Sequence, residues 1–154
     1  MKLWASLARQ PGWAAAVCTW RTLLGDEWEY LRPLTTRVGM ATSVPVEGTA
    51  VFGDVVELDP GNLVVVHPTT QTIVEIRSDD LEIRAVDPRK LGAAICQAMS
   101  LIENFSEVPK SPCRMWHIGN KLARRQPSKP VYLADARDAG RVVATVGLLS
   151  TLYP

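Results

Sequence analysis

The chain has 154 residues, of which 47% are hydrophobic and 21% are charged, and its formal net charge is +1. These values are ordinary for a globular protein and exclude an intrinsically disordered chain. A chain of this length is typical of a single domain, here residues 1–154, that buries roughly 70% of the unfolded surface.

The chain shows no targeting or membrane segment. No apolar run approaches the ~18 residues that a bilayer-spanning helix needs, so we expect no membrane partner. Near the N-terminus, residues 9–11 (Arg-Gln-Pro) interrupt the apolar stretch and leave it too short for a signal peptide. Cys18, Cys96 and Cys113 are odd in number and far apart, which favours free thiols in the reducing cytoplasm over a disulfide framework.

The first third of the chain predicts two helices and a long connection. Apolar residues at helical spacing indicate a short helix at about residues 3–7 and a longer one at residues 11–25. The two tryptophans on the apolar stripe of the longer helix are expected in the core. Residues 26–50 have no sustained period, and we interpret them as a connection with one short strand near residues 44–46.

Residues 55–86 predict an antiparallel meander with one buried face. Turn signals at residues 59–62, 68–71 and 78–80 divide this segment into strands. A loop centred on residues 69–70 and a turn at residues 60–61 determine which side chains share the inner face. These are Val56, Leu58, Leu63, Val65, Val74 and Ile76.

The last turn of this segment predicts a specific hairpin. A two-residue loop at residues 79–80 places Glu75 opposite Arg84. The same register places Arg77 opposite Glu82 and two apolar pairs on the inner face. Because cross-strand pairs of this kind stabilise a sheet, we predict a hairpin that closes at this loop.

The outer face of the meander carries an apolar patch, formed in this register by Val64, Val66 and Ile73. Monomeric proteins tend to avoid such patches. We therefore expect this face to be covered, either by the N-terminal helix or by a protein partner.

A helix is predicted directly after the meander. Asp87 is a suitable N-cap and Pro88 a suitable first helical residue. The apolar stripe of this helix includes Leu91, Ile95 and Met99, which we expect to pack on the inner face of the meander.

The end of the chain predicts a strand-loop-strand-helix segment. Short strands at residues 114–119 and 131–133 flank a basic loop, and residues 138–152 form the final helix. The chain ends in apolar sequence, which favours a domain excised from a longer polypeptide. The predicted fold class is α+β: an N-terminal helix, an antiparallel β-meander at about residues 55–86 with helices packed on it, and this C-terminal segment.

The strongest functional signal is a basic segment. Residues 110–130 contain six basic residues and no acidic one, whereas the remainder contains 11 basic and 16 acidic residues. Clustered Lys and Arg attract nucleic-acid phosphates regardless of sequence, and an aromatic ring can stack on a base. The alternative is a solvated loop that pairs with acidic residues elsewhere. The candidate nucleic-acid-binding residues are Arg114, Trp116, Lys121, Arg124, Arg125 and Lys129.

The cysteines and histidines do not complete a chemical site. Cys113 and His117 have a spacing seen in zinc sites, but a structural zinc needs four ligands. Cys113 with His67 or His117 forms a candidate nucleophile–base pair, although three cysteines and two histidines offer such pairs in any fold. Gly-rich phosphate loops and the common hydrolase motifs are absent. We therefore predict no metal and no cofactor, and the case for an enzyme is weak.

The chain carries no motif of a family that we recognise. It predicts a non-catalytic binding or regulatory module that contacts nucleic-acid phosphates through residues 110–130. The alternative is a protein-interaction or structural domain of a larger polypeptide that uses the outer sheet face. A cysteine-dependent enzyme built on Cys113 ranks third.

Overall fold

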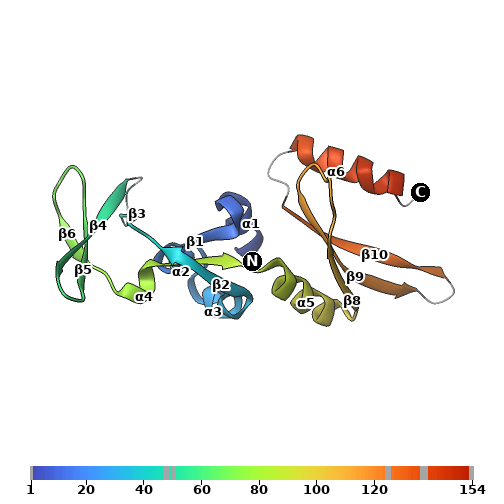
Figure 1. The fold of residues 1–154 in the computed structure, drawn as a ribbon, viewed down its shortest axis with the longest axis horizontal. Helices are drawn as coiled ribbons and strands as arrows, with labels where there is room; N and C mark the ends of the chain where they lie inside the picture. Colours follow the sequence, from blue (N-terminus) through green and yellow to red (C-terminus); the bar gives the residue numbers. More distant parts are fainter. Residues whose placement is uncertain (1, 47–48, 50, 124–125, 136–138, 153–154) are drawn as a thin grey trace. The chain divides into compact units, whose positions relative to one another are not determined.

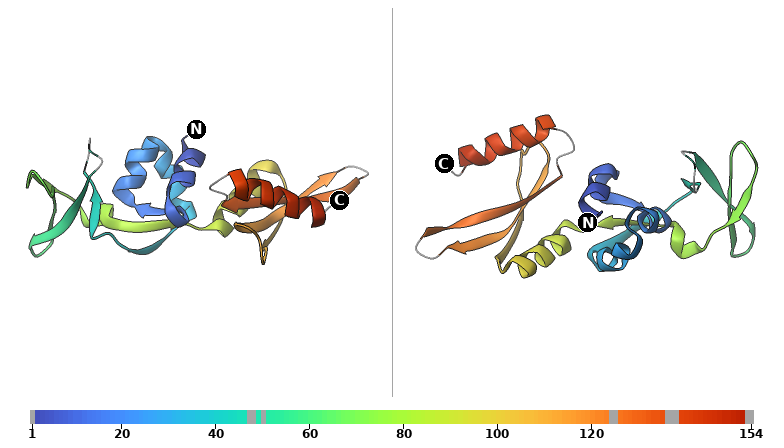
Figure 2. Two further views of the ribbon diagram at one scale, coloured as in Figure 1. Left: turned by 90° about the horizontal axis from the view of Figure 1, so that it is seen from above. Right: turned by 180° about the vertical axis from the view of Figure 1, so that it is seen from behind.

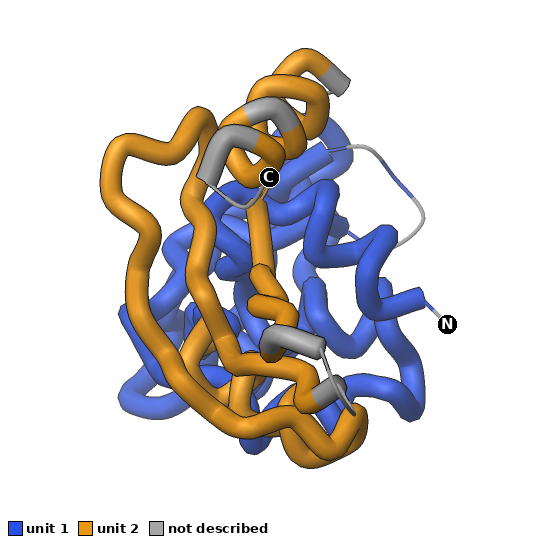
Figure 3. Tube along the Cα trace, turned by 90° about the vertical axis from the view of Figure 1, so that its right-hand side faces the viewer, with its two compact units in different colours: residues 1–86 blue, residues 87–154 orange. Residues whose placement is uncertain are grey.

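The fold is α+β with antiparallel sheets (Figure 1). The computed structural model describes residues 2–46, 49, 51–123, 126–135 and 139–152. Although the length predicts one domain, the chain divides into two compact units, residues 1–86 and 87–154 (Figure 3). Each unit has its own helices and strands and is described by itself. No helix among the described residues is long and apolar enough to cross a bilayer.

Short helices begin the first unit. They are α1 (Leu3–Arg9), α2 (Val17–Leu24) and α3 (Trp28–Leu31), linked by 3-10 turns at Pro11–Trp13, Gly25–Glu27 and Arg32–Leu34. The predicted first helix is confirmed as α1.

The helix predicted at residues 11–25 is wrong in its first part. Gly12 and Trp13 have positive φ angles of 63° and 56°, which interrupt a right-handed helix. Residues 14–16 are three alanines with high helix propensity, yet they form strand β1 (Ala14–Ala16). Their pairing with a distant strand outweighs this local preference. The predicted end is correct, because Gly25 caps α2 at a φ of 59°.

The first sheet of this unit has the strand order β1-β7-β2, with β7 (Glu82–Val86) between its two antiparallel neighbours. Strand β2 (Thr35–Met40) lies in the segment that the sequence analysis interpreted as a connection. The tryptophans are in the core as predicted: Trp13 is 5% exposed and Trp20 is fully buried.

The second sheet has the order β3-β4-β5-β6. Two predicted turns are confirmed, because Asp59 pairs with Asn62 and Val65 pairs with Val74. A register shift between Glu57 and Asp59 moves the rest of β4 by one residue from the predicted pairing. The short strand expected near residues 44–46 is confirmed as β3. The bounds are β3 (Ser43–Pro45), β4 (Phe52–Asp59), β5 (Asn62–Val66) and β6 (Ile73–Glu75).

The hairpin predicted at residues 79–80 is wrong. Residues 78–81 form a helical turn, α4 (Ser78–Leu81), and β7 pairs with β1 and β2 instead of β6. The charges that suggested the hairpin pair locally. Arg77 Nε lies 3.1 Å from Asp80 Oδ2, and Arg84 Nη1 lies 2.8 Å from Glu82 Oε2.

The faces of the predicted meander are also corrected. Val56, Leu58 and Val74, expected on the buried face, are 40%, 53% and 53% exposed. On the opposite face Val64 is 2% exposed, so the expected outer patch of three exposed residues is not formed, although Ile73 is 56% exposed. With β7 in another sheet and β3 beside β4, the four-stranded sheet contains different strands from the predicted meander.

The second unit places two helices around a sheet of strand order β10-β9-β8. The elements are α5 (Pro88–Met99), β8 (Ile102–Glu107), β9 (Arg114–Ala123), β10 (Gln126–Asp135) and α6 (Ala139–Leu152). The C-terminal helix is confirmed as α6. Both strands that flank the basic segment are longer than predicted, and β8 was not predicted.

The capped start of α5 is confirmed, because Asp87 Oδ1 accepts hydrogen bonds from the backbone N–H groups of Arg89 and Lys90. The predicted packing partner is wrong. Helix α5 packs on β8 and β9 of its own unit, with Leu91 4% exposed and Met99 54% exposed.

Close backbone approach positions α5 and β8 against β9. A Cβ atom at Gly119 would lie 2.5 Å from the Ile102 carbonyl oxygen and 2.8 Å from Cys96 Sγ. The Cys96 thiol donates a hydrogen bond to the Ile118 carbonyl oxygen at 3.1 Å. Cys96 is 2% exposed, consistent with its place beside the predicted apolar stripe.

Candidate functional site

The β9–β10 hairpin extends beyond the rest of its sheet (Figures 1 and 2). The pairing of β8 with β9 reaches Ile102 opposite Asn120. From Lys121 onward, the described part of β9 pairs only with β10, in a two-stranded ribbon. The sequence predicts a basic loop here, whereas Lys121 and Lys129 lie on strands.

The two lysines of this ribbon face each other. Lys121 and Lys129 are direct cross-strand partners, so their side chains share a face, and both are exposed. Neither forms an ion pair with an acidic residue in the part of the chain that the structure describes. Like charges placed directly opposite are destabilising, so this arrangement costs stability unless an anion lies between them.

The remaining candidate residues divide into three cases. Arg114 is exposed at the start of β9, and its guanidinium lies 5.1 Å from the centre of the Trp116 ring. Trp116 is 4% exposed, so its ring offers no open surface on which a base could stack. Arg124 and Arg125, between the two strands, lie outside the described residues.

No family model, curated protein or solved structure matches this chain.

The cysteines and histidines contact other side chains. Cys113 Sγ lies 3.2 Å from Thr145 Oγ1 in the buried interior. His117 Nε2 lies 3.3 Å from Asn120 Oδ1, and its ring lies 5.3 Å from that of Tyr132. Among the described residues, no three His, Cys, Asp or Glu side chains gather where they could hold a metal.

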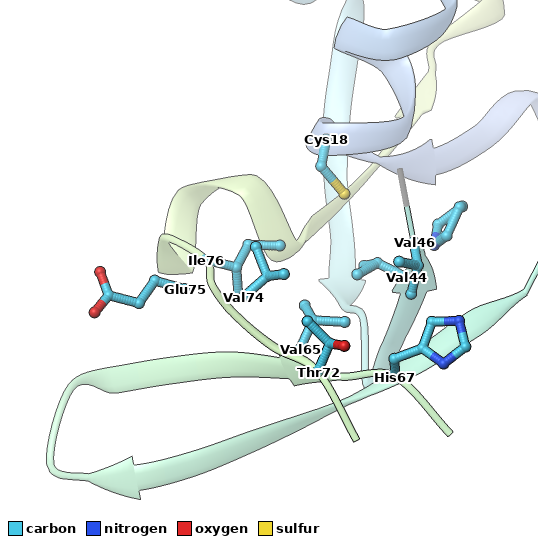
Figure 4. Close-up of a pocket in the computed structure, with 10 residues that line it drawn as sticks. Cys18, Val44, Val46, Val65, His67, Thr72, Val74, Glu75 and Ile76 are labelled. Carbon is cyan, nitrogen blue, oxygen red and sulfur yellow. The ribbon is translucent and has the colours of Figure 1, made fainter. Parts of the chain in front are cut away.

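The first unit contains a cavity that the sequence does not predict. It has a volume of about 360 Å³ and lies on one face of the four-stranded sheet, beneath the Cys18 thiol of α2 (Figure 4). Valine and isoleucine side chains from three strands form most of its wall. No local sequence pattern predicts this cavity, because its wall is formed where α2 and strands distant in sequence pack together. Its lining residues include Val44, Val46, Val65, His67, Val74 and Ile76.

The histidine at the edge of this cavity has a structural role. His67 Nδ1 accepts hydrogen bonds from the backbone N–H groups of Thr69 and Thr70, at 3.2 and 3.1 Å. These two hydrogen bonds hold the turn that follows β5.

Cys18 is expected to be the most reactive of the three thiols because it is the least buried. Cys96 and Cys113 are 2% and 8% exposed, whereas Cys18 is half-buried. Burial raises the pKa of the Cys18 thiol, against the opposing effect of hydrogen bonds from Thr19. Since the thiolate is the reactive form, the alkylation rate of Cys18 should level off at a higher pH than that of an ordinary thiol. Mass spectrometry of the native protein after timed iodoacetamide treatment checks this order and pH dependence. Faster labelling of Cys96 would contradict it.

Proposed function

We propose that this protein is a non-catalytic binding module that contacts nucleic-acid phosphates through the β9–β10 ribbon. The observation that carries the proposal is the pair of opposed, exposed lysines, Lys121 and Lys129, on a projecting two-stranded ribbon. A phosphate placed near both ammonium groups would convert a repulsive pair into a favourable one.

The shape of the ribbon suits a duplex. The major groove of B-DNA is about 12 Å wide and admits a two-stranded β-ribbon. The sequence between Glu107 and Asp135 contains no acidic residue, so nothing within it would repel the phosphates. Because Trp116 is buried, we assign binding to charge alone and expect no sequence preference.

The expected location is the cytoplasm. The three cysteines are free, as a reducing compartment requires. Nucleic acid is also available there as a partner.

Binding should depend steeply on salt. Contact with four to six phosphates gives a log–log slope of about −4 to −5 for a duplex, because bound phosphates release counterions. Replacing Lys121 and Lys129 with glutamine should reduce the magnitude of this slope by about 2. The measurement is fluorescence anisotropy of labelled duplex DNA and single-stranded RNA between about 50 and 200 mM salt.

A matched control removes two exposed cations of the first unit, by Arg9→Gln and Arg32→Gln, and should leave the slope unchanged. Equal loss in both double variants would mean that net charge rather than the ribbon controls binding. Absence of saturable binding below about 100 μM would exclude the proposal altogether.

A further inference from the structure

Strand β6 forms an open edge of the four-stranded sheet of the first unit. It is last in the order β3-β4-β5-β6 and pairs only with β5 among the described strands of this unit. Ile73 and Val74 are 56% and 53% exposed, and Glu75 is also exposed.

The hydrogen bonds to β5 determine which backbone groups point outward. The His67 N–H donates to the Thr72 carbonyl oxygen at 2.9 Å, and the Ile76 N–H donates to the Leu63 carbonyl oxygen at 3.0 Å. Residues alternate in an antiparallel ladder, so the N–H and C=O groups of Ile73 and Glu75 point away from β5. These groups are placed to pair with another strand.

This edge is short, at three residues, and carries no lysine, proline or bulge. Lysine, proline or a bulge commonly blocks an exposed edge. Strand β10, an edge of the sheet in the second unit, contains Pro127 and Pro130. Strand β6 is Ile-Val-Glu, contains no proline and has a regular register with β5.

The cavity of the first unit adjoins the same edge. Val74 and Ile76 form part of its wall, together with Val65 of β5 and Val44 of β3 (Figure 4). Side chains of a strand alternate between faces, so every second residue of a strand added to β6 would lie on the cavity side. Those positions favour apolar side chains.

The charge at this edge determines which side chains are favoured at the alternate positions of an added strand, on the face away from the cavity. Strand β6 carries one charged side chain, Glu75, and Arg77 beyond it is paired with Asp80. Glu75 points away from the cavity (Figure 4), on the face that the remaining side chains of an added strand would share. Opposite charges favour lysine or arginine at these positions.

We propose that an extended peptide with alternating basic and apolar residues binds this protein by adding to β6 as a fifth, antiparallel strand. Its backbone pairs with the outward groups of Ile73 and Glu75, its apolar side chains contact the cavity side, and its cations face Glu75. Peptide recognition by strand addition uses this division between backbone affinity and side-chain specificity.

The test uses a synthetic peptide of alternating lysine and valine with blocked, fluorescently labelled ends. We expect saturable binding to the full chain, and weaker binding of a peptide of alternating glutamate and valine. In an antiparallel strand the residue opposite Glu75 is a lysine whose N–H points at β6. Methylation of the lysine amides should therefore abolish binding, and methylation of the valine amides should preserve it. Equal binding by both methylated peptides would overturn the proposal.

Protein variants test the same edge. Glu75→Pro removes an N–H that does not bond to β5, so the sheet keeps its internal pairing. Because it also removes the carboxylate, it should weaken binding of the lysine–valine peptide by at least about tenfold, the scale of one lost hydrogen bond. Glu75→Lys should lower the affinity for the lysine–valine peptide about three- to tenfold and raise the affinity for the glutamate–valine peptide.

Asp54→Asn, which removes an exposed charge from the interior strand β4, is the matched control and should change affinity little. Lys121→Gln with Lys129→Gln should leave peptide binding intact, which separates this inference from nucleic-acid binding. Unchanged peptide binding by Glu75→Pro and Glu75→Lys, in variants with a wild-type circular dichroism spectrum, would place the peptide elsewhere and refute the proposal.

Discussion

Replacing Trp20 with alanine is expected to lower the free energy of unfolding by about 3–5 kcal/mol, the range for large aromatic residues in a core. Trp20 is fully buried and stacks on Trp28, with ring centres 6.3 Å apart and planes inclined by 6°. Its Nε1–H also donates a 2.9 Å hydrogen bond to the Arg84 carbonyl oxygen in the central strand β7. The substitution therefore removes both packing and a polar anchor between α2 and the first sheet.

Urea denaturation followed by far-ultraviolet circular dichroism measures this effect. Trp4→Ala is the matched control because Trp4 is 44% exposed, and it should cost much less. A loss below about 1 kcal/mol for Trp20→Ala would contradict the assignment of Trp20 to the core.

The two stacked tryptophans differ in whether the indole N–H group has a hydrogen-bond partner. Trp28 Nε1 is buried and has no hydrogen-bond partner among the described atoms, whereas Trp20 Nε1 has Arg84. Replacement of each by phenylalanine removes a similar volume, but only Trp20→Phe leaves a carbonyl without its donor. Trp20→Phe should therefore cost about 1–3 kcal/mol more than Trp28→Phe.

Replacing Gly119 with alanine is expected to destabilise residues 87–154 by about 3 kcal/mol, the upper end of the usual range for overpacking. The new methyl group would lie 2.5 Å from the Ile102 carbonyl oxygen, and this backbone atom is held by the β8–β9 pairing. The Cys96 thiol, 2.8 Å from the same position, blocks the other side. The methyl group can therefore be accommodated only if β8 and α5 separate from β9.

Gly39→Ala is the control for this prediction. Its added methyl group would meet only Ile83 Cδ1, at 3.9 Å, which is an ordinary contact. Removal of glycine's freedom in the unfolded chain should make this variant neutral or slightly stabilising, by up to about 1 kcal/mol. Amide hydrogen exchange resolved by peptide would show faster exchange in β8 and β9 for Gly119→Ala. Unchanged exchange there would contradict the close packing of these strands.

Features encoded within a few neighbouring residues could be predicted from sequence. Asp87 and Pro88 define the start of α5, Gly25 ends α2, and a turn forms at residues 59–62. Each depends on a cap or turn whose energetics are local. The basic character of residues 110–130 is likewise a property of composition, independent of the fold.

Tertiary structure alone decided the partners of each element. Residues 82–86 had a complementary strand nearby in sequence, yet β7 lies between β1 and β2, because pairing on both sides satisfies more backbone groups than one hairpin. The cavity beneath Cys18, the open edge of β6 and the opposition of Lys121 to Lys129 depend on the same long-range choices. A local pattern specifies which face of a strand is apolar, but the strand's partner is selected by the free energy of the whole assembled unit.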